Sequence, residues 1–210
     1  MISTRPNRVP RRAGLFLATF ALLCLSSVSA ESNAKFNRKV DLGQPAPDWK
    51  DLPSTDGRQR RLSDYANAKA VVLVFTCNHC PVAQAYENRL IELTSHFKDK
   101  GVAVVAISCS LERQDRMEKM KQRAKERGYN FDYLKDESQQ VGRDYGATVT
   151  PHVFVLDQSR KIAYMGAIDD SRNPEDVTEH YLRDAIAAVL AGQQPEVRET
   201  LQFGCAVVYR

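Results

Sequence analysis

One short stretch of the sequence, an apolar run that ends at two cysteines, constrains the fold more than any other. The run covers residues 71–75, which are mostly β-branched, and Cys77 and Cys80 follow it. A continuous apolar run without alternation is typical of a strand buried on both faces, as at the centre of a parallel sheet. After the cysteines, Pro81 suits the first turn of a helix, and apolar residues recur at helical spacing up to Phe97 in a predicted helix that ends at residue 98. The sequence thus predicts a buried strand, two cysteines and a helix.

The two cysteines form a C-x-x-C pair of the kind that exchanges disulfides. The thiolate is the attacking species, and the unpaired N–H groups and dipole of a helix N-terminus favour negative charge. We therefore expect Cys77 to be the nucleophile and Cys80, one turn further on, to be the more buried, resolving thiol. His79 lies between them. A partly protonated imidazole there would stabilise the Cys77 thiolate and make the disulfide a stronger oxidant.

The first 30 residues are typical of a secretory signal peptide. Arginines precede an apolar run at residues 13–25, and small residues lead to Ala30. We expect cleavage after Ala30, because Val28 and Ala30 supply the small-residue pair that signal peptidase recognises and the apolar run is short for a bilayer span. A retained membrane anchor is the alternative. The mature protein should then be periplasmic or extracellular, with no stable membrane insertion.

Removal of this segment changes the charge balance. The whole sequence has 30 Lys and Arg against 26 Asp and Glu, and four arginines are the only charged side chains among the first 30 residues. The mature chain is therefore formally neutral and lacks the positive field that nucleic-acid binding needs, so we exclude nucleic acid as a partner. Export also places the C-x-x-C pair where thiols meet oxidants, as a structural bridge or as a working exchange site.

Further patterns predict one α/β domain. Residues 102–107 form a second apolar run, and Cys109 just beyond it should emerge at the same sheet edge as Cys77, because the two strands would be parallel. Residues 153–156 and 162–165 predict an antiparallel hairpin. Weaker signals predict a hairpin around residues 56–57, a short helix from residue 63, a solvated helix at 113–127, a strand at 131–134, and helices at 138–145 and 174–190.

A second stretch that carries chemistry is Thr150-Pro151-His152, immediately before the hairpin. Proline cannot donate a hydrogen bond to a β-ladder, so Pro151 marks an entry turn into the strand. A cis peptide bond is one way to make such a turn.

Taken in order, the strand, Cys77-Asn78-His79-Cys80-Pro81, the helix, the next strand, Thr150-Pro151 and the hairpin resemble the thioredoxin fold. More narrowly, residues 74–81, 150–157, 166–170 and 203–205 resemble the exported redoxin branch related to the alkyl hydroperoxide reductase and thiol-specific antioxidant (AhpC/TSA) family. The resemblance implies an α/β, thioredoxin-like fold with a central mixed sheet and helices on both faces. We accordingly divide the chain into a signal peptide at 1–30, a flexible segment at 31–40, a redoxin domain at 41–191 and a C-terminal extension at 192–210.

The same resemblance implies the site. Cys77 and Cys80 would be the exchanging pair, and Pro151 would be cis and face their disulfide. The residues expected to line the site are Thr76, Asn78, His79, Pro81, Thr150, Pro151 and His152. The buried acid that thioredoxins carry six residues before the first cysteine is Val71 here, so the sequence identifies no proton acceptor for Cys80.

Three other interpretations stay open. Cys77 could be the reactive thiol of a peroxidase, although residues 72–74 are apolar and leave Thr76 as the polar donor next to it. Cys77, Cys80, His79 and His152 could be soft ligands for copper or zinc. The two cysteines could also form a structural bridge, although closing so short a loop constrains the unfolded chain little.

Two further cysteines have open roles. Cys109 is either a small buried apolar residue or an auxiliary thiol, and Cys205 could pair with Cys109 or relay electrons to Cys77. His96 and His180 are expected on helix surfaces. The sequence as a whole predicts an exported thiol–disulfide oxidoreductase that has no bound cofactor. Its partners would be protein thiols and disulfides together with a redox partner that the sequence does not identify.

Overall fold

The central strand β3 (Ala70–Phe75) is buried along its whole length, as its continuous apolar sequence predicts. The computed structural model describes residues 1–2 and 34–210, so the predicted signal peptide lies almost entirely outside the described residues. β3 is the middle strand of a five-stranded sheet with the order β5-β4-β3-β7-β8. The other strands of this sheet are β4 (Val102–Ser108), β5 (Asp132–Lys135), β7 (His152–Leu156) and β8 (Ile162–Gly166).

The strand directions bring the segments of chemical interest to one edge of this sheet. β3, β4 and β5 are parallel, so the segments that follow them emerge together. β7 is antiparallel to β3 and pairs His152 with Phe75, so the beginning of β7 lies at that same edge. The shared edge therefore gathers Cys77 with Cys109, as the sequence predicts, and with Pro151, as the resemblance implies.

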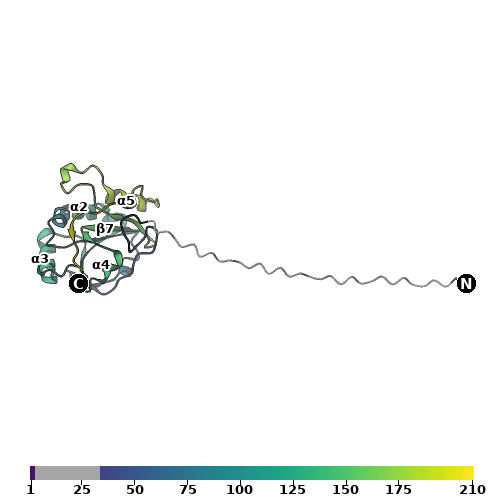
Figure 1. Ribbon diagram of the computed structural model, residues 1–210, viewed down its shortest axis with the longest axis horizontal. Helices are drawn as coiled ribbons and strands as arrows, with labels where there is room; N and C mark the ends of the chain where they lie inside the picture. The colour runs from purple at the N-terminus through teal and green to yellow at the C-terminus, as the bar shows by residue number, and fades with distance from the viewer. Residues whose placement is uncertain (3–33) are drawn as a thin grey trace. The chain divides into compact units, whose positions relative to one another are not determined.

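Helices cover both faces of the sheet, which confirms the expected mixed α/β architecture. Helices α2 and α5 lie over one face and α4 lies over the other (Figure 1), each packing apolar residues against the sheet. The helices are α1 (Pro81–Ala85), α2 (Glu87–Phe97), α3 (Met117–Arg127), α4 (Gln140–Tyr145) and α5 (Tyr181–Leu190). Short 3-10 turns are η1 (Leu62–Tyr65), η2 (Lys98–Lys100), η3 (Arg113–Asp115) and η4 (Pro174–Asp176).

The helix predicted at residues 81–98 is interrupted at Tyr86, where α1 ends and α2 begins. Tyr86 is buried, and its hydroxyl donates to Asp169 Oδ1 and to the Ser171 carbonyl, both at 3.0 Å. These bonds to a distant loop fix the side chain at the junction. The long-range contacts that accompany the break are not visible in the local sequence pattern.

The helix predicted at residues 174–190 is also shorter than expected. Its first part is the turn η4, and α5 begins only at Tyr181. Asp170 accepts hydrogen bonds from the backbone N–H groups of Thr178 (3.0 Å) and Glu179 (3.1 Å), which hold this stretch in a non-helical conformation. The side chain of a preceding loop thus competes with helix formation.

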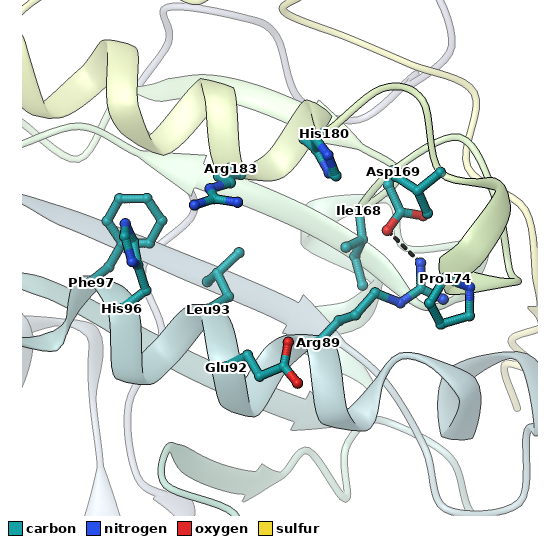
Figure 2. Close-up of a pocket in the computed structure, with 11 residues that line it drawn as sticks. Arg89, Glu92, Leu93, His96, Phe97, Ile168, Asp169, Pro174, His180 and Arg183 are labelled. Atoms are coloured by element: carbon teal, nitrogen blue, oxygen red, sulfur yellow. Dashed lines mark hydrogen bonds and ion pairs between the residues drawn. The ribbon is translucent and has the colours of Figure 1, made fainter.

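A cleft of about 400 Å³ lies at the surface between α2 and the beginning of α5 (Figure 2). At one end of it, Arg89 points toward Asp169 and forms an ion pair with it at 2.5 Å. His96 and His180, both expected at helix surfaces, are exposed and line the cleft. No cysteine is among its lining residues, so the cleft is separate from the predicted redox chemistry.

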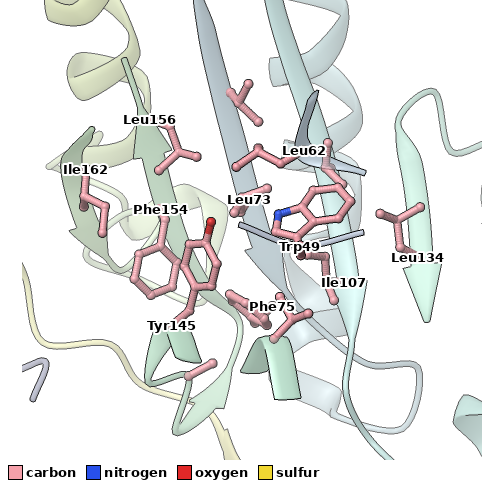
Figure 3. Packing of buried hydrophobic residues seen from close by; sticks show 14 of the residues in the cluster. Trp49, Leu62, Leu73, Phe75, Ile107, Leu134, Tyr145, Phe154, Leu156 and Ile162 are labelled. Atoms are coloured by element: carbon pink, nitrogen blue, oxygen red, sulfur yellow. The ribbon is translucent and has the colours of Figure 1, made fainter. Parts of the chain in front are cut away.

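The face of the sheet opposite α2 and α5 carries a core that the N-terminal segment helps to close. Trp49 packs there with residues of β3, β7 and α4 (Figure 3). Phe75 contacts the rings of Tyr145 (centroids 5.6 Å apart) and Phe154 (5.7 Å). Full burial of each such aromatic side chain contributes roughly 1.5–3 kcal/mol, so this face holds the end of β3 firmly next to the cysteines.

Two small sheets complete the fold. β1 (Leu52–Pro53) and β2 (Gln59–Arg60) form the hairpin predicted around residues 56–57. β6 (Val149–Thr150) pairs antiparallel with β9 (Cys205–Ala206), which brings the C-terminal segment back to the edge of the main sheet. Within the described residues, no helix is long and apolar enough to cross a membrane.

Candidate active site

The loop between β3 and α1 holds the first two cysteines. Pro81 is the first residue of α1, and Cys80 is its N-cap, with Sγ accepting a hydrogen bond from the Ala83 N–H at 3.3 Å. The predicted helix start is therefore correct for Cys80. Cys77 precedes the N-cap by three residues and lies in the loop, so the predicted position of Cys77 at the helix N-terminus is wrong.

The segment Thr150-Pro151 lies against both cysteines, and its peptide bond is cis, as the resemblance implied. The hydroxyl oxygen of Thr150 is 3.3 Å from Cys77 Sγ, and its carbonyl oxygen is 3.2 Å from Cys80 Sγ. A protonated Cys80 would donate to this carbonyl. The beginning of β7 thus contacts both sulfur atoms through one residue.

Cys80 forms a disulfide with Cys205, with a Cα–Cα distance of 5.8 Å. Cys77 and Cys109 are free thiols, and both are buried. Cys205 therefore does not pair with Cys109, one of the two roles that the sequence left open, and the relay of electrons to Cys77 stays a prediction. In this form Cys80 Sγ carries no proton, so its approach to the Thr150 carbonyl is a contact and not a hydrogen bond.

Asp115 is a buried carboxylate beside the loop that the sequence analysis missed. It accepts hydrogen bonds from the Asn78 backbone N–H (2.5 Å) and the Ser110 hydroxyl (2.7 Å), and it contacts His79 Nδ1 at 2.5 Å. It lies in the stretch predicted as a solvated helix at residues 113–127. The signal in the sequence was that this stretch follows β4, whose end lies at the same sheet edge as Cys77.

The Asn78 side chain extends this network. Its Nδ2 donates to the Gln114 carbonyl at 2.8 Å, and its Oδ1 accepts from the buried Tyr133 hydroxyl at 3.0 Å. Its own carbonyl accepts from Gln84 Nε2 at 2.6 Å. The loop between β3 and α1 is thereby tied to β5, to α1 and to the segment after β4, which makes it a rigid platform for Cys77.

The electrostatics at Cys77 differ from the expectation of a stabilised thiolate. Burial raises the pKa of the Cys77 thiol and the nearby Asp115 carboxylate adds to this, while the Thr150 hydroxyl and the backbone N–H groups of Cys80 and His79 act in the opposite direction. His79 makes its close contact with Asp115, so the imidazole is already engaged by a carboxylate. In this oxidised form, Cys77 is a protected thiol.

A cavity of about 360 Å³ opens next to Cys77. It is bounded by His79, by the segment that follows β4, by Thr150 and by the last residues of the C-terminal segment. Cys109 also lines it, although the Cys109 side chain is buried, and burial raises the pKa of its thiol to about 11. Cys77 itself lines this cavity, so the cavity gives access to the site from outside.

Thr76 and His152, both expected to line the site, differ in how exposed they are. Thr76 is partly exposed, and its N–H continues the β3–β4 pairing by donating to the Ile107 carbonyl at 3.0 Å. His152 is buried, with its ring 4.5 Å from that of Phe154, and its Nδ1 has no partner among the described residues. Burial lowers the pKa of His152 to about 3. His152 therefore belongs to the core beneath the site.

A metal-binding arrangement also differs from the predicted one. Of the four predicted donors, Cys80 is bound to Cys205 and His152 is buried in the core. Cys77, His79 and Asp115 instead bring one sulfur, one nitrogen and one carboxylate oxygen within 4.8 Å of one another. Thiolate, imidazole and carboxylate are donors that zinc accepts, so these three residues fit a metal better than the predicted set.

Together, the fold and the site define a redoxin of the thioredoxin fold. Residues 42–165 match the model of the AhpC/TSA family, and this chain belongs to that family. No functionally curated protein matches the sequence.

Solved structures support the same class. A hypothetical protein from Sinorhizobium meliloti 1021 is 32% identical with a TM-score of 0.77, over 83% of this chain and 97% of that one. An uncharacterized conserved protein from Geobacillus kaustophilus is 35% identical with a TM-score of 0.77, over 83% and 95%. A putative thiol:disulfide interchange protein DsbE from Chlorobium tepidum is 26% identical with a TM-score of 0.60, over 72% and 99%.

Proposed function

We propose that this protein is an exported thiol–disulfide oxidoreductase that exchanges disulfides with other proteins through Cys77 and Cys80. The observation that carries the proposal is the contact of Thr150 with both sulfur atoms, its hydroxyl with Cys77 and its carbonyl with Cys80. Family membership and the likeness to a putative thiol:disulfide interchange protein support the same reaction class.

In the proposed cycle, the reduced protein has both Cys77 and Cys80 as thiols. The Cys77 thiolate attacks a substrate disulfide, so a bond forms between Cys77 Sγ and one substrate sulfur while the substrate S–S bond breaks and the other sulfur leaves. Cys80 then attacks Cys77 Sγ, and the second substrate sulfur leaves. The substrate gains two electrons, and the Cys77–Cys80 pair is oxidised. The reverse sequence donates a disulfide.

The site supplies groups for each part of this cycle. His79 and Asp115 lie within 4.8 Å of the Cys77 sulfur, a distance that one bridging water spans, so this pair is placed to accept the Cys77 proton. The Thr150 hydroxyl and the backbone N–H groups of His79 and Cys80 stabilise the thiolate once it has formed. The Thr150 carbonyl is placed to hold the Cys80 thiol until it attacks. The proposed lining residues are Thr76, Asn78, Pro81 and Pro151, with His152 buried beneath them.

The proposal includes export and the division of the chain. Residues 1–30 would be removed as a signal peptide, which leaves the redoxin domain at 41–191 in the periplasm or outside the cell, where protein disulfides are its substrates. An N-terminus at Glu31, measured by mass spectrometry on protein purified from the exported fraction, supports this. An N-terminus at Met1 on membrane-bound protein overturns it in favour of the retained anchor.

The test of function uses residues 31–210, reduced and freed of reductant, with a disulfide-bonded protein such as insulin as substrate. We expect the wild type to reduce it, C77S to be inactive, and C80S to accumulate a mixed disulfide at Cys77, because the resolving thiol is missing. Turnover by C77S at the wild-type rate overturns the proposal. Rapid consumption of hydrogen peroxide by both wild type and C80S, without insulin reduction, assigns the peroxidase function instead.

A metal-binding module is the second candidate, and the cluster of Cys77, His79 and Asp115 favours it. Three protein donors with one open position are typical of a catalytic zinc site. The test is calorimetric titration of reduced protein with Zn²⁺. Stoichiometric binding that D115N abolishes and that blocks insulin reduction supports this candidate, whereas absence of binding by the wild type excludes it.

A further inference from the structure

The C-terminal segment occupies the edge of the cis-proline strand. β9 pairs antiparallel with β6, and the register places Cys205 opposite Thr150. The Val207 N–H adds a hydrogen bond to the Thr148 carbonyl at 2.9 Å. An extended peptide that adds a strand to an exposed edge is a common mode of peptide recognition. Here that position is taken by a segment of the chain that carries a cysteine.

Close approach of the two backbones requires a glycine just before this cysteine. A Cβ atom added to Gly204 would lie 2.0 Å from the Thr150 carbonyl oxygen and 2.7 Å from the Thr150 carbonyl carbon. Only glycine has room there without a shift of one strand. The contact places the Cys205 sulfur next to the same residue that touches Cys77 and Cys80.

The segment beyond Cys205 is held independently of the disulfide. Gln139 Nε2 donates to the Val208 carbonyl at 2.8 Å, and Gln139 Oε1 accepts from the Arg210 N–H at 2.8 Å. The Tyr209 hydroxyl donates to the Ala147 carbonyl at 2.5 Å, and the Arg143 guanidinium lies 4.6 Å from the Tyr209 ring. These contacts keep Cys205 near Cys80 when their disulfide opens, so that the Cys205 thiol acts at a high effective concentration.

The three sulfur-bearing residues form one cluster. Cys77 and Cys80 pack together with Ala83, and Cys205 packs against them. Cys80 is fully buried between its two neighbours, Cys77 is 4% exposed and Cys205 is partly exposed. Cys80 is therefore the shared member, and both of its possible disulfide partners are already in place.

We propose that Cys205 is a third redox-active cysteine, which takes over the disulfide from Cys77 after each reaction with substrate. The proposal rests on the function proposed above. The Cys205 thiolate attacks Cys80 Sγ of the Cys77–Cys80 disulfide; the Cys80–Cys205 bond forms, the Cys77–Cys80 bond breaks, and Cys77 leaves as a thiolate that takes up the proton lost by Cys205. No electrons enter or leave, so the step is a reversible isomerisation.

The consequence is that Cys77 is again a free thiol in the oxidised protein, held protonated by its burial. The described structure is the product of this step, with Cys80 bound to Cys205 and Cys77 free beside the cavity. Cys205, which is partly exposed, and not the buried Cys77, is then the residue at which an external dithiol regenerates the reduced protein.

The experiment follows the disulfide after one turnover. Reduced protein of residues 31–210 is mixed with excess insulin for a single turnover and quenched in acid. Free thiols are then alkylated with N-ethylmaleimide in urea at mildly acidic pH, and the thiols released by reduction are labelled with iodoacetamide. We expect wild type to carry Cys80–Cys205 with Cys77 alkylated, and C205S to carry Cys77–Cys80, so that Cys77 alkylation falls from close to one label per chain to close to none. C109S is the matched control and should map as the wild type does.

The outcomes separate the two proposals. If wild type reduces insulin but ends with Cys77–Cys80 and an alkylated Cys205, the transfer is wrong while the oxidoreductase function stands. If neither wild type nor C205S reduces insulin, the function itself fails and the transfer fails with it. The wild-type map alone decides the first question, so the conclusion does not depend on the folding of C205S.

Discussion

His152 should make the stability of the protein fall steeply as the pH drops below neutral. Its side chain is buried next to Phe154, and burial lowers its pKa to about 3, so the folded protein keeps the imidazole neutral. In the unfolded chain the same group has a pKa of about 6.5. The stability that depends on the neutral imidazole is therefore complete above pH 6.5 and is lost as the pH falls from about 6.5 toward 3.

The size of the effect follows from the two pKa values. At pH 5 the unfolded chain binds almost one more proton at this site than the folded chain does. Linkage then gives a loss of about 2 kcal/mol in the free energy of unfolding between pH 7 and pH 5. That is a large part of the 5–15 kcal/mol that is typical of a folded domain.

The assay is urea unfolding at pH 7 and pH 5, with oxidised protein at both. Trp49 is the only tryptophan in the sequence and is 3% exposed, so its fluorescence reports on the core. H152Q cannot acquire a charge, and carboxylates titrate equally in both proteins, so the wild type should lose about 2 kcal/mol more than H152Q between the two pH values. Equal losses in wild type and H152Q would refute the assignment of a buried, neutral His152.

Three further predictions concern the cysteines and the packing of the helices. Cys109 has a thiol pKa of about 11, so at pH 8 it should react with iodoacetamide about two orders of magnitude more slowly in the folded protein than in urea-unfolded protein. Mass spectrometry measures the two rates, and equal rates would contradict the burial of Cys109. G204A should separate β9 from β6, because the added Cβ would meet the Thr150 carbonyl. Dithiothreitol should then reduce the Cys80–Cys205 disulfide faster in G204A than in the control L201A, which changes an exposed side chain. Equal reduction rates would show that the strand pair tolerates the methyl group. E87Q should lower the free energy of unfolding by about 2 kcal/mol, because Glu87 accepts hydrogen bonds from Arg123 (2.5 Å) and from the Tyr129 hydroxyl (2.6 Å) and so joins α2 to α3. A change below about 0.5 kcal/mol in urea unfolding would show that the Glu87–Arg123 ion pair contributes little.

Much of the fold follows from local sequence patterns. The two apolar runs form the adjacent parallel strands β3 and β4. Their burial could be predicted because apolar and polar residues do not alternate along them. The hairpin of β7 and β8 and the start of α1 at Pro81 were also predicted. The two helix breaks were not, because each coincides with a contact to a loop outside the helical pattern, at Tyr86 through the distant Asp169 and before α5 through Asp170 of the preceding loop.

Residues of the candidate site that belong to one short motif could be predicted from the sequence, whereas those brought together by long-range contacts could not. Cys77 and Cys80 come from a short motif, and the cis Thr150-Pro151 bond was implied by the family resemblance. The pairing of Cys80 with Cys205 depends on how the C-terminal segment returns across the domain, which no spacing rule gives. Asp115 was missed because the many basic residues that follow it suggested a solvated helix, and because its partners His79 and Asn78 are distant in sequence.

The disulfide of Cys80 also controls how much of the chain is closed into a loop. Its partners Cys80 and Cys205 are separated by 125 positions, so this bond encloses most of the domain, whereas a Cys77–Cys80 bond would enclose only the motif itself. In the chain-entropy treatment the longer loop stabilises the folded protein by about 5 kcal/mol and the shorter one by about 2 kcal/mol. Transfer of the disulfide between these positions would therefore alter the melting temperature of the whole domain, and thermal unfolding would report which sulfur atoms are joined.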